Sequence, residues 1–426
     1  GFNRGYQITG ETGECCFQMW GQPLTFEQFF NRLMSKTFDA FLSDALEEIE
    51  LAGLTRRLTP LETPQLPRVR RGDAMVVNFS SNDYLGLAAH PALRDAAMGE
   101  WERGGFGSGA SRLICGTMTA HEDLEVSIAR FKRTPAALAF HSGYAAALGT
   151  IPAICGKDDV IIMDKLSHAC LIDAARLSGA VLRVFPHNDL NKLESHLAWA
   201  SRKHPQARVL IVVESVYSMD GDLAPLREIV DLKERYGAWL FLDEAHAVGV
   251  LGPSGGGLAE ELGIGDRIEV QMGTLGKALG AHGAYVAGSR VLRDYLINRA
   301  RSFIFSTAPP APVAVAATKA IEIAQSPEGG RLRECLWKNI RNLAVELQAP
   351  KPESAIIPHI LGPEKAATSA STELLQKGFL VAAIRFPTVA KGAARLRFTV
   401  TSLHHPDQIR SLGEVFRNLS FSASSV

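Results

Sequence analysis

The strongest constraint on the fold is the alternation of short apolar runs with helix-like stretches between about residues 76 and 315. This alternation is typical of a parallel sheet with helices on both faces, because parallel neighbours need a long crossover connection. The runs expected to form strands are residues 136–140, 160–163, 181–185, 209–213, 239–242, 268–272 and 284–287. The helical stretches between them include residues 121–132, 168–178, 190–202 and 225–236. The sequence therefore predicts an α/β fold with a mostly parallel, seven-stranded sheet.

The pattern changes on both sides of this region. Residues 1–24 show no regular pattern, and residues 25–75 combine helical periodicity over 25–57 with a proline-punctuated linker. We expect a large domain over residues 76–315 and a smaller α+β domain over 316–426. The elements expected near and within the smaller domain are helices at 312–325, 330–348 and 406–417 and strands at 355–360, 379–384 and 396–401.

Composition excludes several classes of protein. Basic and acidic residues balance to a formal net charge of zero, so nothing indicates a nucleic-acid partner or an anionic membrane surface. The six cysteines form no CxxC pair, so neither a metal site nor dithiol chemistry is expected. The sequence shows neither a signal peptide nor an apolar run of about 20 residues, so we expect a cytoplasmic protein.

A lysine stands in a segment of small residues, GTLGKALGAHGAYVAGS, residues 273–289. Lys277 follows a strand-like run, and glycines allow the backbone around it to approach another group closely. Lysine amines in such places form Schiff bases with carbonyls or with pyridoxal phosphate. The alternative is a surface lysine in a glycine loop.

A carboxylate ends a second apolar run, in GAWLFLDEAHAVG, residues 237–249. Ligand sites in α/β proteins lie at the carboxyl ends of strands, where Asp243 would keep a pyridinium nitrogen protonated. The alternative is a helix N-cap. Because Asp243 and Lys277 both follow strand-like runs about one βα unit apart, the pair favours the cofactor hypothesis.

Other candidates are weaker when taken singly. Gly143 and Tyr144 begin a helix after a strand, where their N–H groups would bind a phosphate, and Thr274 would donate its hydroxyl to the same phosphate. His168 would stack on a cofactor ring, and Ser218 ends another strand. The alternatives are a simple turn for the first three, a cap or core residue for His168, and a turn former for Ser218.

Taken together, six segments resemble the α-oxoamine synthases, which are fold-type I pyridoxal phosphate enzymes. These enzymes join an amino acid to an acyl thioester with loss of CO2. The resemblance covers about residues 40–420. The segments are GSGASRLICGT (107–117), HSGYAAALG (141–149), SHACLIDAAR (167–176), VESVYSMDGDLAPL (213–226), LDEAHAVGVLG (242–252) and the lysine segment.

Four activities occur in that family: 8-amino-7-oxononanoate synthase, 2-amino-3-ketobutyrate CoA ligase, 5-aminolevulinate synthase and serine palmitoyltransferase. GAHGAYVAGS and residues 383–409 resemble the first, although Phe386 stands where proline is usual. The ketobutyrate ligase and a non-catalytic partner subunit remain alternatives. A dehydrogenase is excluded, because no GxGxxG motif opens a helix after the first strand.

The resemblance implies roles for matching residues. Lys277 would hold the cofactor as a Schiff base and act as general base, and Asp243 would pair with the pyridinium nitrogen. His168 would stack on the ring. His246 and Ser218 would contact the phenolic oxygen and the cofactor rim. The residues expected to bind cofactor groups, chiefly the phosphate, are Gly143, Tyr144 and Thr274, with Thr307 reaching the phosphate of a neighbouring subunit.

The same resemblance implies a substrate site. Asn82 would lie near the thioester carbonyl, and Arg397 would pair with the carboxylate of the amino acid. Arg56 and Thr388 match acyl-substrate contacts, although Arg56 is equally well explained as a solvated arginine beside Arg57. The implied reaction condenses L-alanine with pimeloyl-CoA or pimeloyl-carrier protein, in a homodimer with shared active sites.

Overall fold

The computed structural model describes residues 16–19, 22–25 and 37–419, and the chain divides into two compact units between Thr59 and Pro60. In the first unit, strand β1 (Cys16–Met19) pairs antiparallel with β2 (Gln22–Thr25). This hairpin lies where the sequence predicted no regular structure over residues 1–24. That expectation was wrong for the hairpin, because strands this short carry too little alternation to be recognised.

The first unit also contains helix α2 (Phe38–Leu51). The helix begins after Thr37, whose side-chain oxygen accepts a hydrogen bond from the N–H of Ala40, as an N-cap does. The second half of the expected helical segment is therefore confirmed. Its first half, around residues 26–33, lies outside the described residues.

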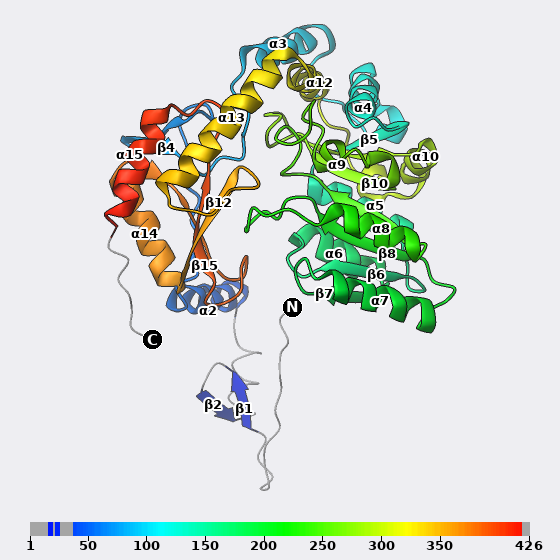
Figure 1. Ribbon diagram of the computed structural model, residues 1–426, viewed down its shortest axis with the longest axis horizontal. Helices are drawn as coiled ribbons and strands as arrows, with labels where there is room; N and C mark the ends of the chain where they lie inside the picture. The colour runs from blue at the N-terminus through cyan, green and yellow to red at the C-terminus, as the bar shows by residue number, and fades with distance from the viewer. Residues whose placement is uncertain (1–15, 20–21, 26–36, 420–426) are drawn as a thin grey trace. The chain divides into compact units, whose positions relative to one another are not determined.

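The second unit is built on a seven-stranded sheet (Figure 1). Strand β11 is antiparallel to both of its neighbours, and the other strands run parallel to one another. In spatial order the strands are β5 (Ala136–Phe140), β11 (Ala284–Gly288), β10 (Val270–Thr274), β9 (Trp239–Asp243), β8 (Val209–Glu214), β6 (Val160–Asp164) and β7 (Val181–Phe185). The mostly parallel, seven-stranded sheet predicted from the sequence is confirmed.

Helices cover both faces of the sheet because its strands are apolar on both sides. In β8, Ile211 and Val213 belong to one buried cluster, whereas Leu210 and Val212 belong to another. The first cluster includes side chains of α4 (Thr119–Phe131), α7 (Leu190–Lys203), α8 (Leu226–Arg235) and α12 (Ala311–Gln325). The second includes side chains of α5 (Gly143–Ile154), α6 (Ala169–Ser178) and α10 (Arg290–Arg299). Such two-sided burial explains why the strands are continuous apolar runs.

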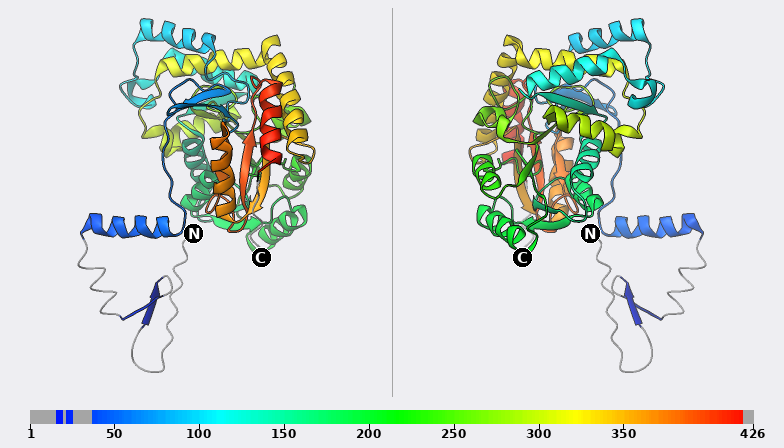
Figure 2. Two further views of the ribbon diagram at one scale, coloured as in Figure 1. Left: turned by 90° about the vertical axis from the view of Figure 1, so that its left-hand side faces the viewer. Right: turned by 90° about the vertical axis from the view of Figure 1, so that its right-hand side faces the viewer.

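Two further three-stranded sheets contain strands from the C-terminal part of the chain (Figure 2). In the first, β15 (Ala394–Thr399) lies between β12 (Ile356–Gly362) and β14 (Ala382–Ile384), all antiparallel. In the second, β4 (Ala74–Asn78) lies between β3 (Arg68–Arg71) and β13 (Phe379–Leu380). The accompanying helices are α13 (Pro327–Glu346), α14 (Glu364–Gln376) and α15 (Pro406–Arg417).

These sheets correct two details of the sequence analysis. The single strand expected over residues 379–384 is two strands in different sheets, and residues 68–71 of the expected linker form β3. The split of residues 379–384 arises because β13 pairs with β4, about 300 residues earlier in the chain, and local patterns do not report such pairing. β3 pairs with the adjacent β4, and this strand is too short to show a clear alternation. The domain boundary expected near residue 315 stays a prediction.

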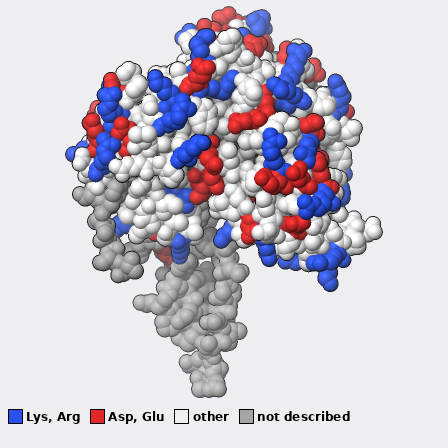
Figure 3. Space-filling model, viewed as in Figure 1, with Lys and Arg blue, Asp and Glu red and all other residues white. Residues whose placement is uncertain are grey.

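The remaining helical segments connect these layers. They are α3 (Pro91–Gly104), η1 (Arg112–Gly116), α9 (Leu258–Leu262), η2 (Gly265–Arg267) and α11 (Arg301–Ile304). Within the described ranges, no helix combines the length and apolar character that crossing a membrane requires. On the face shown in Figure 3, basic and acidic side chains are interspersed, in keeping with the balanced net charge.

Candidate active site

Lys277 lies in a tight loop that follows β10. The loop is held by hydrogen bonds from the N–H of Leu275 to the oxygen of Gly283 and from the N–H of Ala281 to the oxygen of Leu275, each 2.9 Å. Gly280 has a φ of +62°, and a Cβ at this position would lie 2.3 Å from the backbone of Leu87. The close approach that the glycines indicated is therefore present.

The Lys277 side chain is partly buried, and the groups around its amine alter its charge state. Burial lowers the pKa of Lys277 from its usual value, although the carboxylates of Asp243 and Glu214 favour the charged form. A lowered pKa increases the fraction of neutral amine near pH 7, and the neutral amine is the nucleophilic form. The loop therefore presents a lysine suited to covalent chemistry.

Two carboxylates end neighbouring strands beside this lysine. Asp243 ends β9, Glu214 ends β8, and the two residues are register partners. Burial raises the pKa of Asp243 to about 6, and burial together with Asp243 raises the pKa of Glu214 well above its usual value. A buried carboxylate of this kind is stabilised by a nearby cation, as a protonated pyridine would provide.

A hydrogen-bonded chain joins Lys277 to the small C-terminal sheets. The Lys277 Nζ lies 2.8 Å from Nε2 of His246, whose Nδ1 lies 2.8 Å from the hydroxyl of Tyr84. The Tyr84 hydroxyl is also 3.2 Å from Oδ1 of Asn82, which accepts from both terminal nitrogens of Arg397 at 3.2 Å. Residues from four distant segments of the chain thus meet at one place.

Arg397 is a buried cation on β15. Its Nε donates to the backbone oxygen of Ser218 at 2.6 Å, which also brings Ser218 into the site. Among the described residues, no carboxylate forms a salt bridge with Arg397. A buried guanidinium without an acidic partner is suited to binding an anionic ligand.

A polar cradle lies at the start of α5. Ser142 caps this helix by accepting from the N–H of Ala145, which leaves the N–H groups of Gly143 and Tyr144 without partners inside the helix. A Cβ on Gly143 would lie 3.1 Å from Cγ2 of Thr274, so the two residues are adjacent. The hydroxyl of Thr274 is buried and has no hydrogen-bond partner among the described residues. These groups match the needs of a phosphate.

The phenol of Tyr144 is separate from this cradle. It is exposed and donates a hydrogen bond to Asp173, so only the backbone of Tyr144 faces the helix end. His168 caps α6 by accepting from the N–H of Cys170, and its own N–H donates to Glu214. His168 is therefore a cap residue, and because its ring is exposed, its stacking role stays a prediction.

A cavity of about 490 Å³ opens beside Lys277. Its wall includes Asn82, Asp83 and Lys277, together with glycines of the lysine loop. Asp83 accepts hydrogen bonds from the N–H groups of Leu87 and Ala88, and burial raises its pKa to about 6. The cavity thus joins the lysine to the asparagine expected near the reacting carbonyl.

Three expected site residues lie apart from these contacts. Thr307 is exposed and forms an isolated bridge with Ser111, and Thr388 is exposed in the loop after β14. Arg56 belongs to the first unit. The roles expected for these three residues stay predictions.

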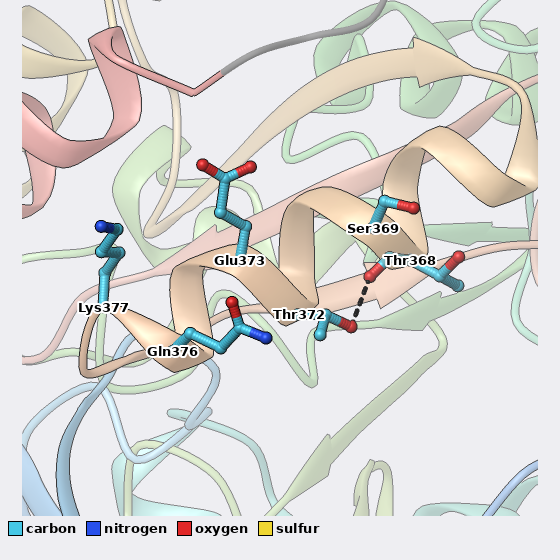
Figure 4. A pocket seen from close by; sticks show the side chains of 6 residues that line it. All are labelled: Thr368, Ser369, Thr372, Glu373, Gln376 and Lys377. Carbon is cyan, nitrogen blue, oxygen red and sulfur yellow. Dashed lines mark hydrogen bonds between the residues drawn. The ribbon is translucent and has the colours of Figure 1, made fainter.

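A second hollow lies along α14 (Figure 4). All six of its lining residues come from this helix or its end, and the hydroxyl of Thr372 donates to the backbone oxygen of Thr368 at 2.9 Å. It shares no residue with the cavity beside Lys277. This hollow is therefore part of the outer surface of α14.

Sequence reasoning missed Tyr84 and Glu214. Tyr84 is fully buried and stands two residues after Asn82 in SSNDYLGL, and Glu214 ends a strand inside a quoted motif without being singled out. The strand-end position that identified Asp243 applied equally to Glu214. Nothing local distinguishes Tyr84, because its partner His246 is 162 residues away.

The seven-stranded sheet, the lysine after β10 and the carboxylate at the end of β9 define a fold-type I pyridoxal phosphate enzyme. The family model for aminotransferase class I and II matches residues 74–416. The 8-amino-7-oxononanoate synthase of Citrifermentans bemidjiense is 45% identical over 382 residues, which are 88% of this chain and 97% of that protein. The chain belongs to the aminotransferase class I and II family and, within it, to the 8-amino-7-oxononanoate synthases.

Solved structures agree with this assignment. A serine palmitoyltransferase variant from S. paucimobilis, with a bound pyridoxal phosphate–myriocin aldimine, is 29% identical with a TM-score of 0.83, over 89% of this chain and 96% of that chain. The 8-amino-7-oxononanoate synthase of Francisella tularensis is 28% identical with a TM-score of 0.67, over 80% of this chain and 96% of that chain.

Proposed function

We propose that this enzyme condenses L-alanine with a pimeloyl thioester, carried on coenzyme A or on a carrier protein. The products are 8-amino-7-oxononanoate, CO2 and the free thiol, and the reaction serves biotin biosynthesis. The observation that carries this proposal is the hydrogen-bonded chain from Lys277 to Arg397. It brings together, in one site, an amine with a lowered pKa and a buried guanidinium that has no acidic partner among the described residues.

The cofactor is pyridoxal phosphate, and the residues present fit it. The unpartnered hydroxyl of Thr274 and the N–H groups of Gly143 and Tyr144 would hold its phosphate. Asp243 would pair with its ring nitrogen, His168 would stack on the ring, and His246 and Ser218 would contact its rim. When bound, the cofactor supplies an electron sink for the carbanion formed at the α-carbon of the amino acid.

Lys277 has two tasks in this proposal. It holds the cofactor covalently, and once released it accepts the α-proton of the amino acid at Nζ. Burial lowers the pKa of the amine, so that a neutral base is present near pH 7. His246, 2.8 Å away, orients this amine through Nε2.

The other residues of the chain would bind substrate. Arg397 has donors beyond those used by Ser218 and Asn82, and these would pair with the carboxylate of L-alanine. The amide nitrogen of Asn82 would donate to the thioester carbonyl, because its oxygen is already an acceptor for Arg397. Arg56 and Thr388 are proposed contacts of the acyl group.

A homodimer with shared active sites is proposed for a separate reason. Four apolar side chains near Thr307 are strongly exposed, which is unusual for a monomer surface: Phe106, Leu113, Ile114 and Phe305. A partner that covered them would place Thr307 at the subunit boundary. Ile114→Asp is expected to shift the protein to monomer in sedimentation velocity and to abolish activity, whereas an unchanged dimer would contradict this interface.

Thiol release tests the proposed reaction. With pyridoxal phosphate, the protein should release coenzyme A from pimeloyl-CoA when L-alanine is added, and Lys277→Ala should abolish this release without unfolding the protein. Matched reactions use glycine with pimeloyl-CoA and glycine with acetyl-CoA. Faster release with glycine and acetyl-CoA would contradict the proposal and favour the ketobutyrate ligase activity.

A further inference from the structure

Tyr84 occupies the centre of the hydrogen-bonded chain. Its side chain is fully buried, and the Arg397 guanidinium, which can only donate, lies beside its hydroxyl. Two side chains near this hydroxyl can accept its proton. One is Nδ1 of His246 at 2.8 Å, and the other is Oδ1 of Asn82 at 3.2 Å. A hydroxyl has a single proton, so it can donate to only one of these neighbours at a time.

The state of His246 decides which neighbour receives that proton. Burial, Lys277 and Arg397 together lower the pKa of His246 well below its usual value, so its ring is neutral and carries one N–H. If that N–H is at Nδ1, it donates to the Tyr84 oxygen, and Tyr84 then donates to Asn82. If the N–H is at Nε2, it donates to Lys277, and Tyr84 donates to Nδ1.

We propose that Tyr84 is a positioning residue that links the protonation state of Lys277 to the direction of the hydrogen bond at Asn82. When Lys277 is an ammonium, Nζ donates to Nε2 of His246 and the Tyr84 O–H points to Asn82. When Lys277 is a neutral amine, Nε2–H donates to Nζ and the Tyr84 O–H points to His246.

The change between these arrangements conserves protons. Lys277 loses one proton to water in the cavity that it lines, the single N–H of His246 moves from Nδ1 to Nε2, and Tyr84 keeps one O–H. His246 and Tyr84 stay neutral, and only Lys277 changes charge. The base at one end of the site is thereby coupled to the amide at the other.

Other charged or titratable groups also act on Lys277 and must be held constant in any test. They lie on β8, β9, α6 and β15, and at the start of α6: Glu214, Asp243, Cys170, Arg397 and His168. None of these five residues is replaced in Tyr84→Phe, although this variant also removes the interaction between the Tyr84 phenol and Arg397. Tyr84→Phe therefore interrupts the chain without replacing any of these groups.

The first test measures the Lys277 amine in cofactor-free protein. Trace labelling with acetic anhydride across a pH series, read by peptide mass spectrometry, gives the titration midpoint of this amine. In Tyr84→Phe, an Nδ1–H of His246 would be buried without a partner, so the Nε2–H form is favoured, and that form requires a neutral amine. The midpoint is expected to fall by about one pH unit.

Tyr236→Phe is the matched control. Tyr236 donates to Glu194 near the start of β9, far along the strand from Asp243, so this variant also loses one hydroxyl hydrogen bond. Its Lys277 midpoint should equal that of the unchanged protein. An unchanged midpoint in Tyr84→Phe would overturn the proposal.

A second measurement needs no variant of Tyr84. In histidine-labelled protein, the 15N signals of His246 are assigned by their loss in His246→Gln. Their chemical shifts should show that the ring N–H moves from Nδ1 to Nε2 as Lys277 loses its proton. One fixed tautomer across that range, or an imidazolium, would overturn the proposal even if Tyr84→Phe fails to fold.

The catalytic meaning of the coupling rests on the proposed function, but both measurements use cofactor-free protein. A shifted midpoint in a protein without thiol-release activity would uphold the coupling and refute the proposed function. Activity with an unshifted midpoint would do the reverse.

Discussion

The buried ion pair beneath the site gives a sharp prediction about stability. Lys132 follows α4, and its Nζ donates to Oε2 of Glu244 and to the backbone oxygen of Gly256. Both side chains are about 99% buried or more, with exposures of 1% and 0%. Oε1 of Glu244 also accepts from the N–H of Ala259 at 3.0 Å. The ion pair therefore holds the backbone at both Gly256 and Ala259.

Lys132→Met keeps most of the side-chain volume and removes the charge. An unpaired carboxylate would then remain fully buried, and breaking such a pair costs about 3–5 kcal/mol of unfolding free energy. Urea unfolding of the cofactor-free protein at pH 7.5 would measure this loss. The double variant Lys132→Met with Glu244→Gln should recover much of it, because no unpaired charge remains.

Lys319→Met is the control for this experiment. Lys319 pairs with Glu322 on the outside of α12, with both side chains exposed, and such pairs contribute less than about 1 kcal/mol. A loss in Lys132→Met no larger than in Lys319→Met would refute the reasoning.

Three further predictions concern the strand ends. Thr274→Val should weaken pyridoxal phosphate binding about tenfold in a fluorescence titration. The stability of the cofactor-free protein should stay the same, because the Thr274 hydroxyl has no hydrogen-bond partner among the described residues. A shifted unfolding curve of the cofactor-free variant would contradict this. Burial raises the folded pKa of Asp243 to about 6, so stability is lost as pH rises from about 4 to 6 and this carboxyl group loses its proton. Asp243→Asn should therefore raise the unfolding free energy of the cofactor-free protein by about 3 kcal/mol above about pH 6 and leave it unchanged below about pH 4. Equal effects at both pH values would argue against this reasoning. Burial opposes protonation of His187, but hydrogen bonds to Asp164 and Asp222 raise its pKa to about 10, so its contribution is fully present below about pH 6.5 and lost as pH rises to 10. His187→Gln should remove about 2–3 kcal/mol of the pH dependence of the unfolding free energy. If the unfolding free energies of the variant and the unchanged protein varied with pH in the same way, the contribution of the hydrogen bonds from His187 to Asp164 and Asp222 would be refuted.

The sequence predicted the large sheet well because each strand is buried on both faces. The expected runs at 136–140, 181–185 and 284–287 match β5, β7 and β11 to within a residue. β10 begins two residues later than expected, at Val270, because η2 occupies Gly265–Arg267 just before it. Apolar composition alone did not separate the end of that turn from the start of the strand.

Site prediction succeeded where a polar residue ends an apolar strand, and it failed where the partner is remote. Asp243 and Lys277 were identified from their own neighbourhoods. The link from Tyr84 to His246, and from Asn82 to Arg397 across 315 residues, exists only after folding. Local sequence contains no information about such a contact, so Tyr84 resembled any other core residue.

The pairing of β4 with β13 has a consequence for synthesis of the chain. The N–H of Val77 donates to the oxygen of Gly378, and the N–H of Phe79 donates to the oxygen of Leu380. These N–H groups, near the beginning of the second unit, therefore have their hydrogen-bond partners only after residues about 300 positions later have been synthesised. On the ribosome, that edge and the apolar side chains behind it stay uncovered until residues 378–380 have emerged. Arg397, the proposed substrate-binding cation, is synthesised after these residues.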